Sequence, residues 1–410
     1  MDKLERVVSR VVDEGNCSGC GACAALSKRI SMRLAADGFL RPVVDGDTHT
    51  VERHAVDDAY AAREFKSVCP GRIVRMPAAD NRRIHPTFGP YVQAYQGHAV
   101  DGTVRHAGSS GGVLTALSSF LLESSEVSDA LVARGRVADP LTTEALFLTD
   151  PRQVLETSGS RYAPVAVAAE LASTSSSSVI VGKPCEIAAA HQYAELPSRA
   201  DADRPVYLSF FCAGTPSQIG TEKLVAHLGF ERADVVDVRY RGNGWPGDFK
   251  MTSANGTESR MSYNDSWGVH LGRDIQWRCK ICVDGTGAHA DVSVGDFWEA
   301  DDQGFPKFDD AEGNSVVLAR TPRGLELLQR AQESGVLELS AIDLDDVAKI
   351  QPLQVERRVT LSARLLGRVL AGKRVPRYTG FELMKASTSA TTNQLFRAVV
   401  GTARRSLRRR

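Results

Sequence analysis

The chain has 410 residues, of which 42% are hydrophobic, 24% charged and 7% aromatic. These fractions are typical of a globular protein and exclude wholesale disorder and fibrous repeats. No apolar run reaches the roughly 18 residues that a membrane-spanning helix needs. The charged N-terminus, MDKLERVVSRVVDEG, lacks the apolar core of a secretory signal peptide. We therefore expect a cytoplasmic protein built from about two or three packed units.

The formal net charge is zero, but the charges are unevenly distributed. Residues 351–410 contain 14 Lys and Arg against 2 Asp and Glu, a surplus of +12, so residues 1–350 carry −12. An acidic body with a basic end does not fit a nucleic-acid-binding protein, which needs a folded basic face. The end is either a solvated, poorly ordered tail or an amphipathic helix that makes a weak contact with a membrane surface or an acidic partner. The apolar residues of such a helix would be Leu395, Phe396, Val399, Val400 and Leu407.

The first 77 residues predict a small module. Apolar residues at helical spacing indicate a helix over residues 2–14, which Gly15 ends. Residues 31–44 alternate around Asp37-Gly38, a pattern that predicts a β-hairpin. A second helix over residues 56–65 leads to Cys69-Pro70. This module has too little core to fold alone, so we expect a metal to support it.

From residue 91 onward, short apolar runs typical of buried strands alternate with helix-like segments. The expected strands cover residues 91–100, 129–137, 144–150, 178–184 and 206–214. The expected helices cover residues 111–122, 151–156 and 165–172. This alternation predicts an α/β domain over residues 88–234. Residues 235–350 are richer in strands and loops, and residues 351–410 add a helix near 359–370 before the basic tail.

Cysteine is the most informative residue type, because eight thiols in a reducing cytosol favour metal ligation or redox chemistry over disulfides. Cys17, Cys20 and Cys23 lie three residues apart in a loop whose two glycines let the backbone approach a cluster closely. Cys69 is followed by proline, as the fourth ligand of ferredoxins is, although 45 residues separate it from the triplet. Zinc sites favour paired CxxC knuckles instead. We predict that these four cysteines hold a 4Fe–4S cluster.

The other four cysteines are scattered along the chain: they are Cys185, Cys212, Cys279 and Cys282. The first two follow apolar strands, at corners where a sheet edge presents its loops. Together with the CxxC pair they make four thiolates, enough for a second cubane or for a zinc ion, and their spacing does not choose between the two. Cys185 and Cys212 could instead fill space in the core, and the CxxC pair could be a dithiol couple.

Eight motifs occur in a fixed order over residues 15–350: CSGCGAC, AGSSGGVLTAL, GSRYAP, VGKPCEIAA, FFCAG, GNGWPG, CKIC and DVSVGDFW. In this order they resemble the coenzyme F420 hydrogenase/dehydrogenase beta-subunit family, which also contains 7-hydroxymethyl chlorophyll a reductase. Members bind FAD and one or two 4Fe–4S clusters. The resemblance implies that the four scattered cysteines hold the family's core cluster, and the N-terminal triplet makes the chain similar to the two-cluster branch.

The resemblance also implies an architecture. An N-terminal ferredoxin-like iron–sulfur module (1–77) would pack on an α/β FAD-binding domain (88–234) that includes α+β elements. Residues 235–350 would complete the second iron–sulfur site, and residues 351–410 would follow as a helix and basic tail.

The segment GSSGGVLTAL is a Gly/Ser turn that opens an apolar helix, where free N–H groups suit a pyrophosphate. The alternative is a plain N-cap by Ser109 or Ser110, and the segment is not a GxGxxG dinucleotide fingerprint. With the resemblance, the candidate flavin contacts are Ser109, Ser110, Gly111, Gly112, Thr115, Arg161, Tyr162, Lys183 and Asn243. Arg161 would pair with a phosphate and Tyr162 would cover the isoalloxazine. Lys183 would stabilise the reduced flavin, unless it is simply a solvated lysine.

Two further loops could complete the pocket. RGNGWPG would place Asn243 and Trp245 on the substrate side, and the segment 295–298 would close it. Clusters pass single electrons, whereas a flavin accepts electrons singly and can return a hydride. We therefore predict an oxidoreductase that moves electrons through two 4Fe–4S clusters and FAD, between ferredoxin or coenzyme F420 and an unidentified small organic substrate. The residue that supplies a proton is not identified.

Two other functions stay open. The chain could be a non-catalytic electron-transfer beta subunit of a hydrogenase or dehydrogenase complex. It could also be a zinc-stabilised interaction protein in which the cysteines are structural.

Overall fold

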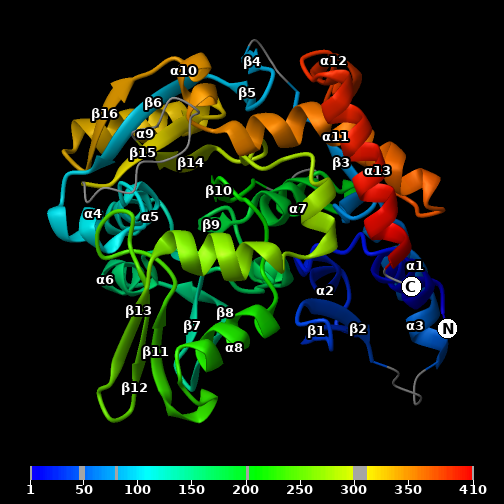
Figure 1. Cartoon of the computed structure of the whole chain (residues 1–410), viewed down its shortest axis with the longest axis horizontal. Helices are drawn as coiled ribbons and strands as arrows, with labels where there is room; N and C mark the ends of the chain where they lie inside the picture. The colour runs from blue at the N-terminus through cyan, green and yellow to red at the C-terminus, as the bar shows by residue number, and fades with distance from the viewer. Residues whose placement is uncertain (1, 46–50, 79–81, 200–202, 299–311, 409–410) are drawn as a thin grey trace.

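An eight-stranded mixed sheet organises the structure, which is a computed structural model that describes residues 2–45, 51–78, 82–199, 203–298 and 312–408. The strand order is β16-β6-β15-β14-β10-β9-β7-β8 (Figure 1). The strands are β6 (Gln93–Ala99), β7 (Asp129–Arg136), β8 (Asp139–Leu148), β9 (Ser178–Gly182), β10 (Val206–Phe210), β14 (Val292–Phe297), β15 (Asn314–Ala319) and β16 (Leu337–Ala341). The expected α/β character is confirmed, and strands from both sides of residue 234 share this one sheet.

The four central strands β7, β9, β10 and β14 run parallel, and every other neighbouring pair is antiparallel. Parallel strands are covered on both faces, which explains their continuous apolar sequences. Along β10, Val206 and Leu208 face one layer of the core, while Tyr207 between them faces the other. Successive side chains of this strand therefore point into opposite layers of the core, as the two-residue period of a β-strand requires.

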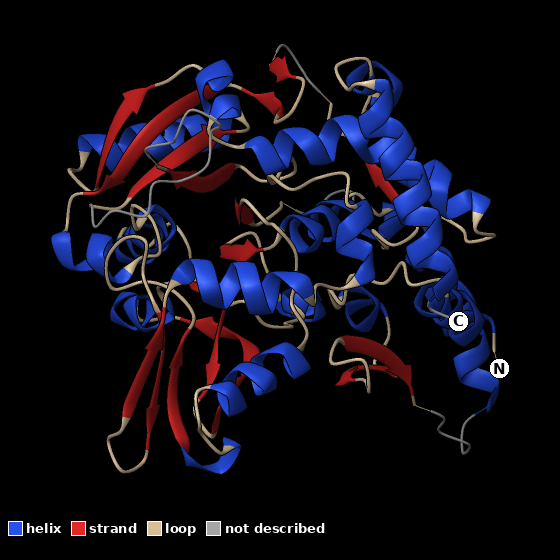
Figure 2. Cartoon of the chain, viewed as in Figure 1, coloured by secondary structure: helices blue, strands red, loops and turns tan. Residues whose placement is uncertain are grey.

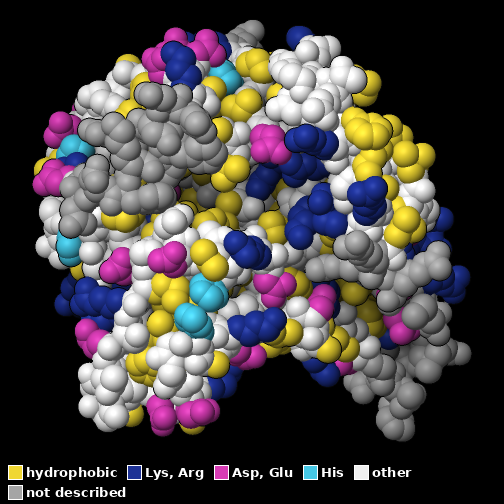
Figure 3. All heavy atoms as spheres, viewed as in Figure 1, with side chains coloured by type: hydrophobic (Ala, Val, Ile, Leu, Met, Phe, Trp, Pro, Cys, Tyr) yellow, Lys and Arg dark blue, Asp and Glu magenta, His cyan; other side chains and the backbone are white. Residues whose placement is uncertain are grey.

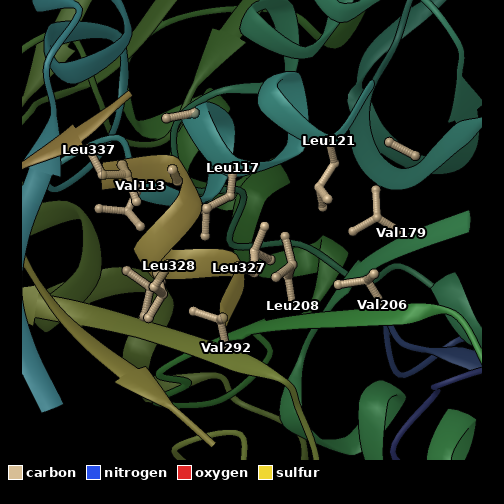
Figure 4. Packing of buried hydrophobic residues seen from close by; sticks show 14 of the residues in the cluster. Val113, Leu117, Leu121, Val179, Val206, Leu208, Val292, Leu327, Leu328 and Leu337 are labelled. Carbon is tan, nitrogen blue, oxygen red and sulfur yellow. The ribbon is translucent and has the colours of Figure 1, made fainter. Parts of the chain in front are cut away.

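Helices cover the two faces of this sheet. Helices α5 (Val113–Glu123) and α9 (Pro322–Glu333) pack on one face, where Leu117 and Leu328 are completely buried among strand side chains (Figure 4). Helix α7 (Pro184–Ala194) and the 3-10 segment η2 (Val167–Ser173) pack on the other face. The expected helix over residues 165–172 is thus a 3-10 segment that begins two residues later.

The N-terminal module contains the elements expected from its sequence. Its elements are α1 (Lys3–Asp13), α2 (Ala22–Leu26), β1 (Ile30–Leu34), β2 (Leu40–Val44), α3 (Val51–Val68) and β3 (Ile73–Arg75). The hairpin β1–β2 turns at Asp37-Gly38, where Gly38 has φ +76° and the Asp37 carboxylate accepts the Phe39 N–H. The module does not stand alone, because β3 pairs with β17 (Arg377–Thr379) near the other end of the chain.

Smaller elements complete the chain (Figure 2). A three-stranded antiparallel sheet is formed by β11 (Val235–Arg239), β12 (Phe249–Ser253) and β13 (Glu258–Met261), and a two-stranded one by β4 (Arg83–His85) and β5 (Gly89–Tyr91). The short helices are α4 (Gly102–Ala107), α6 (Pro151–Val154), α8 (Gln218–His227) and α10 (Leu344–Lys349). The remaining 3-10 segments are η1 (Leu155–Thr157), η3 (Pro197–Arg199), η4 (Arg232–Asp234), η6 (Leu271–Arg273) and η7 (Trp277–Ile281), and η5 (Asn264–His270) is a π-helix.

The basic C-terminal segment is helical. It comprises α11 (Pro352–Leu370), α12 (Leu383–Ser387) and α13 (Thr392–Arg408). Helix α13 packs on α11 at Gly367, whose missing side chain leaves room for the Val399 carbonyl. The expectation of a poorly ordered tail is therefore wrong, and the amphipathic helix is confirmed.

Part of the apolar surface of these C-terminal helices remains exposed. Phe396 is 66% exposed, and Figure 3 shows Lys and Arg side chains beside hydrophobic ones over these helices. Contact with a membrane surface stays a prediction. Among the described helices, none has both the length and the apolar character to cross a membrane.

Candidate metal centres and cofactor site

The first cysteine set lines one cavity. Cys17 and Cys20 lie in the loop between α1 and α2, Cys23 lies in α2, and Cys69 follows directly after α3. Helix α3 therefore returns the chain to the loop after the hairpin, which explains how a cysteine 45 residues away joins the triplet. The cavity walls are apolar and include Val8, Val11, Leu26, Phe65 and Val68.

Two glycines allow the cysteine loop to fold as it does. Gly19 has φ +69° and its N–H donates to the Cys17 sulfur at 3.4 Å. Gly21 has φ +94°, and a Cβ added there would lie 2.7 Å from the backbone nitrogen of Ala169. The loop is held against η2 by the Ala168 N–H, which donates to the Cys20 carbonyl. Only glycine satisfies both the backbone angle and this close approach at position 21.

Gly21→Ala is expected to destabilise the protein more than Gly256→Ala, which serves as its matched control. Gly256 has a similar φ of +82° but nothing within 4 Å of the added Cβ. The control should lose about 1–2 kcal/mol from the unfavourable backbone angle. Gly21→Ala should lose a further amount of about 1–3 kcal/mol from overpacking. Chemical denaturation measures the free energy of unfolding of both variants, and equal losses would contradict this role of Gly21.

The second cysteine set lines another cavity, although its members come from three places in the sequence. Cys185 lies in the first turn of α7, just after β9, and Cys212 follows β10. Because β9 and β10 are parallel neighbours, their carboxyl ends meet at the same edge of the sheet. Cys279 and Cys282 lie on and just after η7, and the Thr215 N–H donates to the Cys279 sulfur at 3.4 Å. The eight cysteines are thus gathered into two groups of four.

The chemistry of these groups fits iron–sulfur clusters. All eight cysteines are free thiols. Within the described ranges, no three His, Cys, Asp or Glu side chains form a group that could hold a single metal ion. Four thiols line each cavity, which is the number of thiolate ligands that a 4Fe–4S cluster takes. Burial raises the pKa of Cys20 to about 11 and that of Cys212 to about 12, so these thiolates need positive charge beside them.

The two cavities are neighbours. Ser18, between Cys17 and Cys20, lines both of them. The Gln276 side chain donates to the Ser18 carbonyl at 2.7 Å, and the Arg278 guanidinium donates to the Pro70 carbonyl at 3.1 Å. Side chains beside the second cysteine set therefore form hydrogen bonds with the backbone beside the first set.

Three glycine-rich loops that lie far apart in the sequence also come together. The Ser160 hydroxyl donates to the Ser109 hydroxyl at 2.8 Å, which joins GSRYAP to GSSGG. The Gly244 N–H donates to the carbonyl of His106, just before GSSGG, at 2.8 Å. Ser160 and Arg241 form an isolated β-bridge. These contacts bring the three loops together, and a shared cofactor pocket between them stays a prediction.

The two serines of GSSGG do not cap the helix that follows them. Gly112 is the N-cap of α5, so neither serine caps the helix. The Ser110 hydroxyl donates to the Asn314 carbonyl at 2.7 Å, and the Gly111 N–H donates to the Ser315 hydroxyl at 2.9 Å. Thr115 is half-buried in the first turn of α5. Asn243, in the third loop, is exposed with φ +60°.

Three other predicted flavin contacts are engaged within the protein. Each guanidinium nitrogen of Arg161 donates to a protein oxygen, on Thr143, Val238 and Pro140, so we leave this residue out of the phosphate site. The Tyr162 ring packs against Trp267, with ring centres 4.6 Å apart. Lys183 is not solvated: its ammonium is buried, donating to Glu186 at 2.7 Å and to the Val165 carbonyl at 3.0 Å.

Arg239 and Arg241 are candidate residues that the sequence reasoning missed. Arg241 is 2% exposed, lies between the rings of Trp245 and Tyr263, and donates to Asp296 at 2.6 Å. Its second terminal nitrogen and the Nε of Arg239 are buried without a hydrogen-bond partner among the described residues. The signal was present as an Arg-x-Arg pair before a glycine-rich loop. Free buried N–H donors of this kind fit an anionic cofactor such as FAD.

Comparisons with known proteins identify the family. The family model described as "Coenzyme F420 hydrogenase/dehydrogenase, beta subunit N-term" matches residues 94–172, and its counterpart for the C terminus of the same protein matches residues 176–345. The coenzyme F420 hydrogenase subunit beta of Methanococcus voltae is 25% identical over 299 residues, which are 70% of this chain and 99% of that protein. An F420-dependent formate dehydrogenase 1 subunit beta of Methanococcus maripaludis is 25% identical over 256 residues, 61% of this chain and 62% of that protein.

One solved structure shares the fold. It belongs to the F420-reducing NiFe hydrogenase complex of Methanosarcina barkeri, with a TM-score of 0.50, 22% identity, and coverage of 68% of this chain and 96% of that chain. The two family models together match more than half of the sequence. The chain therefore belongs to the coenzyme F420 hydrogenase/dehydrogenase beta-subunit family.

Proposed function

We propose that this protein is an iron–sulfur flavoprotein oxidoreductase that transfers electrons to or from coenzyme F420, with ferredoxin as the other possible carrier. The observation that carries the proposal is the gathering of eight cysteines around two adjacent cavities, four to each. Cysteines that only fill space in the core would require no such arrangement. The family, whose relatives above are named for F420, supports the choice of carrier.

The residues around each cavity suit a 4Fe–4S cluster. Cys17, Cys20, Cys23 and Cys69 would hold the outer cluster, and Cys185, Cys212, Cys279 and Cys282 the inner one. Backbone N–H groups point at sulfur in both sets, from Gly19 and from Thr215, and such bonds stabilise the negative charge of a cluster. Clusters would supply one-electron transfer, and FAD the exchange between single electrons and a hydride.

The glycine-rich loops would bind the FAD phosphates. The support is the convergence of three loops, the small residues at their contacts, and the two arginines whose buried N–H groups have no partner among the described residues. Arg241 would be held in place by Asp296, the residue before the end of β14. Ser109, Gly112, Thr115 and Asn243 remain candidates at this site, while Ser110 and Gly111 position the loop on β15. The FAD site would thus lie at the same edge of the sheet as the inner cysteines.

A second function differs only in the partner. Both curated relatives described above are named as subunits, and the solved structure belongs to a complex. The chain would then be an electron-transfer subunit that serves a separate catalytic subunit instead of an enzyme with its own organic substrate. A catalytic subunit that co-purifies with the full chain would favour this second function.

Anaerobic purification of the full chain tests the proposal. We expect about eight iron and eight sulfide atoms per chain, together with about one FAD. Reduced F420 should then bleach the flavin absorbance faster than reduced ferredoxin. Stoichiometric zinc with neither iron nor flavin would overturn the proposal and favour the zinc-stabilised interaction protein. Faster bleaching by ferredoxin would change the carrier and leave the cofactors standing.

A further inference from the structure

We propose that Arg278 is an electrostatic bridge between the two cysteine cavities, and that its charge raises the reduction potentials of both clusters. This inference rests on the proposed function, because it requires a cluster in each cavity. It assigns a role to a residue that is a ligand of neither cluster. Arg278 would act through its positive charge on the two clusters that the cysteines hold.

The geometry places the Arg278 side chain against both sites. The residue lies on η7 directly before Cys279, and it lines the inner cavity. Its guanidinium also donates to the carbonyl of Pro70, the residue directly after Cys69 of the outer set, at 3.1 Å. One buried cation, 2% exposed, therefore touches the polypeptide beside a ligand of each cluster.

The charge of Arg278 is not neutralised by an acidic side chain. No ion pair joins Arg278 to a carboxylate in the part of the chain that the structure describes, and its Nε is buried there without a hydrogen-bond partner. Its other neighbour is the ring of Tyr378, 5.6 Å from the guanidinium carbon. A guanidinium in a protein keeps its proton, so Arg278 carries a full positive charge.

A charge in this position acts on both clusters for a simple reason. Each cluster gains one negative charge when it is reduced, and a nearby cation stabilises the reduced form. The effect is large where water is excluded, because the effective dielectric constant is low. Charge and hydrogen bonds near a cluster are the protein's means of adjusting its potential.

Two other arginines provide matched controls, because each lies beside only one set. Arg41 follows Leu40, whose carbonyl would lie 3.0 Å from a Cβ added at Gly19 of the outer cysteine loop, and its guanidinium donates to Gln276 at 3.1 Å and to Asp37 at 3.0 Å. Arg357 lines the inner cavity and donates to the carbonyls of Cys212 and Ala213 at 2.9 and 2.7 Å. Arg41 is thus an outer control and Arg357 an inner control.

The test is an EPR-monitored redox titration of the anaerobically purified full chain. Arg278→Met should shift both potentials to more negative values, whereas Arg41→Met should shift only the outer and Arg357→Met only the inner one. Signals are assigned with Cys23→Ser, which should retain only the inner cluster. A shift of one potential alone in Arg278→Met, or of neither, with both clusters present, would overturn the bridge.

A second variant separates charge from packing. Arg278→Lys keeps the positive charge but cannot keep both the hydrogen bond to Pro70 and the contact with Tyr378. If the charge of Arg278 sets the potentials, both reduction potentials of this variant should stay close to those of the unmodified protein. If Arg278→Lys behaves like Arg278→Met, or if both variants lose iron, the role is structural and the inference is wrong. An unmodified protein that contains no iron would instead refute the proposed function itself.

Discussion

Cys279→Ser is expected to remove about four of the iron atoms and to abolish electron transfer between the outer cluster and the flavin. Cys279 lies in the inner cavity with Cys185, Cys212 and Cys282, and its sulfur already accepts the Thr215 N–H. Serine is a poor ligand for cluster iron, and three thiolates hold a cubane less firmly than four. The inner set lies at the sheet edge that also carries the proposed FAD site, so its loss should interrupt the path there. Iron assays and the rate of flavin reduction by each carrier measure both effects.

Cys23→Ser is the matched control, because it removes a ligand of the other cavity. It should also lose about four iron atoms, yet it should keep the EPR signal that disappears in Cys279→Ser. The two variants together should account for all of the iron. Loss of the same signal in both variants, or full iron content in Cys279→Ser, would contradict two independent sets of four.

Much of the outer site could be predicted from the sequence, because the relevant information is local. The Cys17–Cys20–Cys23 triplet and its two glycines predict a tightly folded loop, and both glycines have a positive φ in the structure. Cys69 was a harder assignment, since 45 residues intervene. The return of the chain through α3 depends on packing of α3 against α1, which spacing alone does not determine.

The inner site depends on the pairing of strands that lie far apart in the sequence. For this reason the spacing of its cysteines could not decide between a cluster and a zinc ion. Cys185 and Cys212 meet only because β9 and β10 are parallel neighbours in register. The resemblance supplied the grouping that residue spacing could not. The same limit explains why Arg241 was missed: its significance lies in the pairing with Asp296, 55 residues away, and not in its own motif.

The side chains of charged residues were the least predictable. Arg161 and Lys183 were expected to face a ligand or solvent, yet both are committed to protein contacts. The C-terminal segment was assigned too little order on the basis of charge, because composition does not reveal that α11 offers a packing surface to α13. Four arginines of α11 illustrate the point, since they donate to backbone carbonyls and do not project into water: they are Arg357, Arg358, Arg364 and Arg368.

Lys183→Met is expected to lower the free energy of unfolding by about 3–5 kcal/mol, because it leaves a buried carboxylate without its cation. The Lys183 side chain is 9% exposed and that of Glu186 is 1% exposed, and the ammonium lies 2.7 Å from the carboxylate. Glu186 also accepts the N–H groups of Val167 and of Lys183 itself, so the carboxylate cannot turn away to reach water. Chemical denaturation under anaerobic conditions, with iron content measured alongside, gives the loss.

The double variant Lys183→Met/Glu186→Gln separates the cost of the unpaired charge from the cost of lost packing. Glutamine removes the negative charge but keeps an oxygen that can accept the Val167 N–H, so most of the lost stability should return. Breaking one partner of a buried ion pair is costly, whereas replacing both is often close to neutral. If the double variant is as unstable as Lys183→Met, the lysine acts through its packing between β9 and the Val165 carbonyl. The Lys183–Glu186 pair would then hold in place the strand-to-helix corner that carries Cys185, and its charges would not affect the cysteine site.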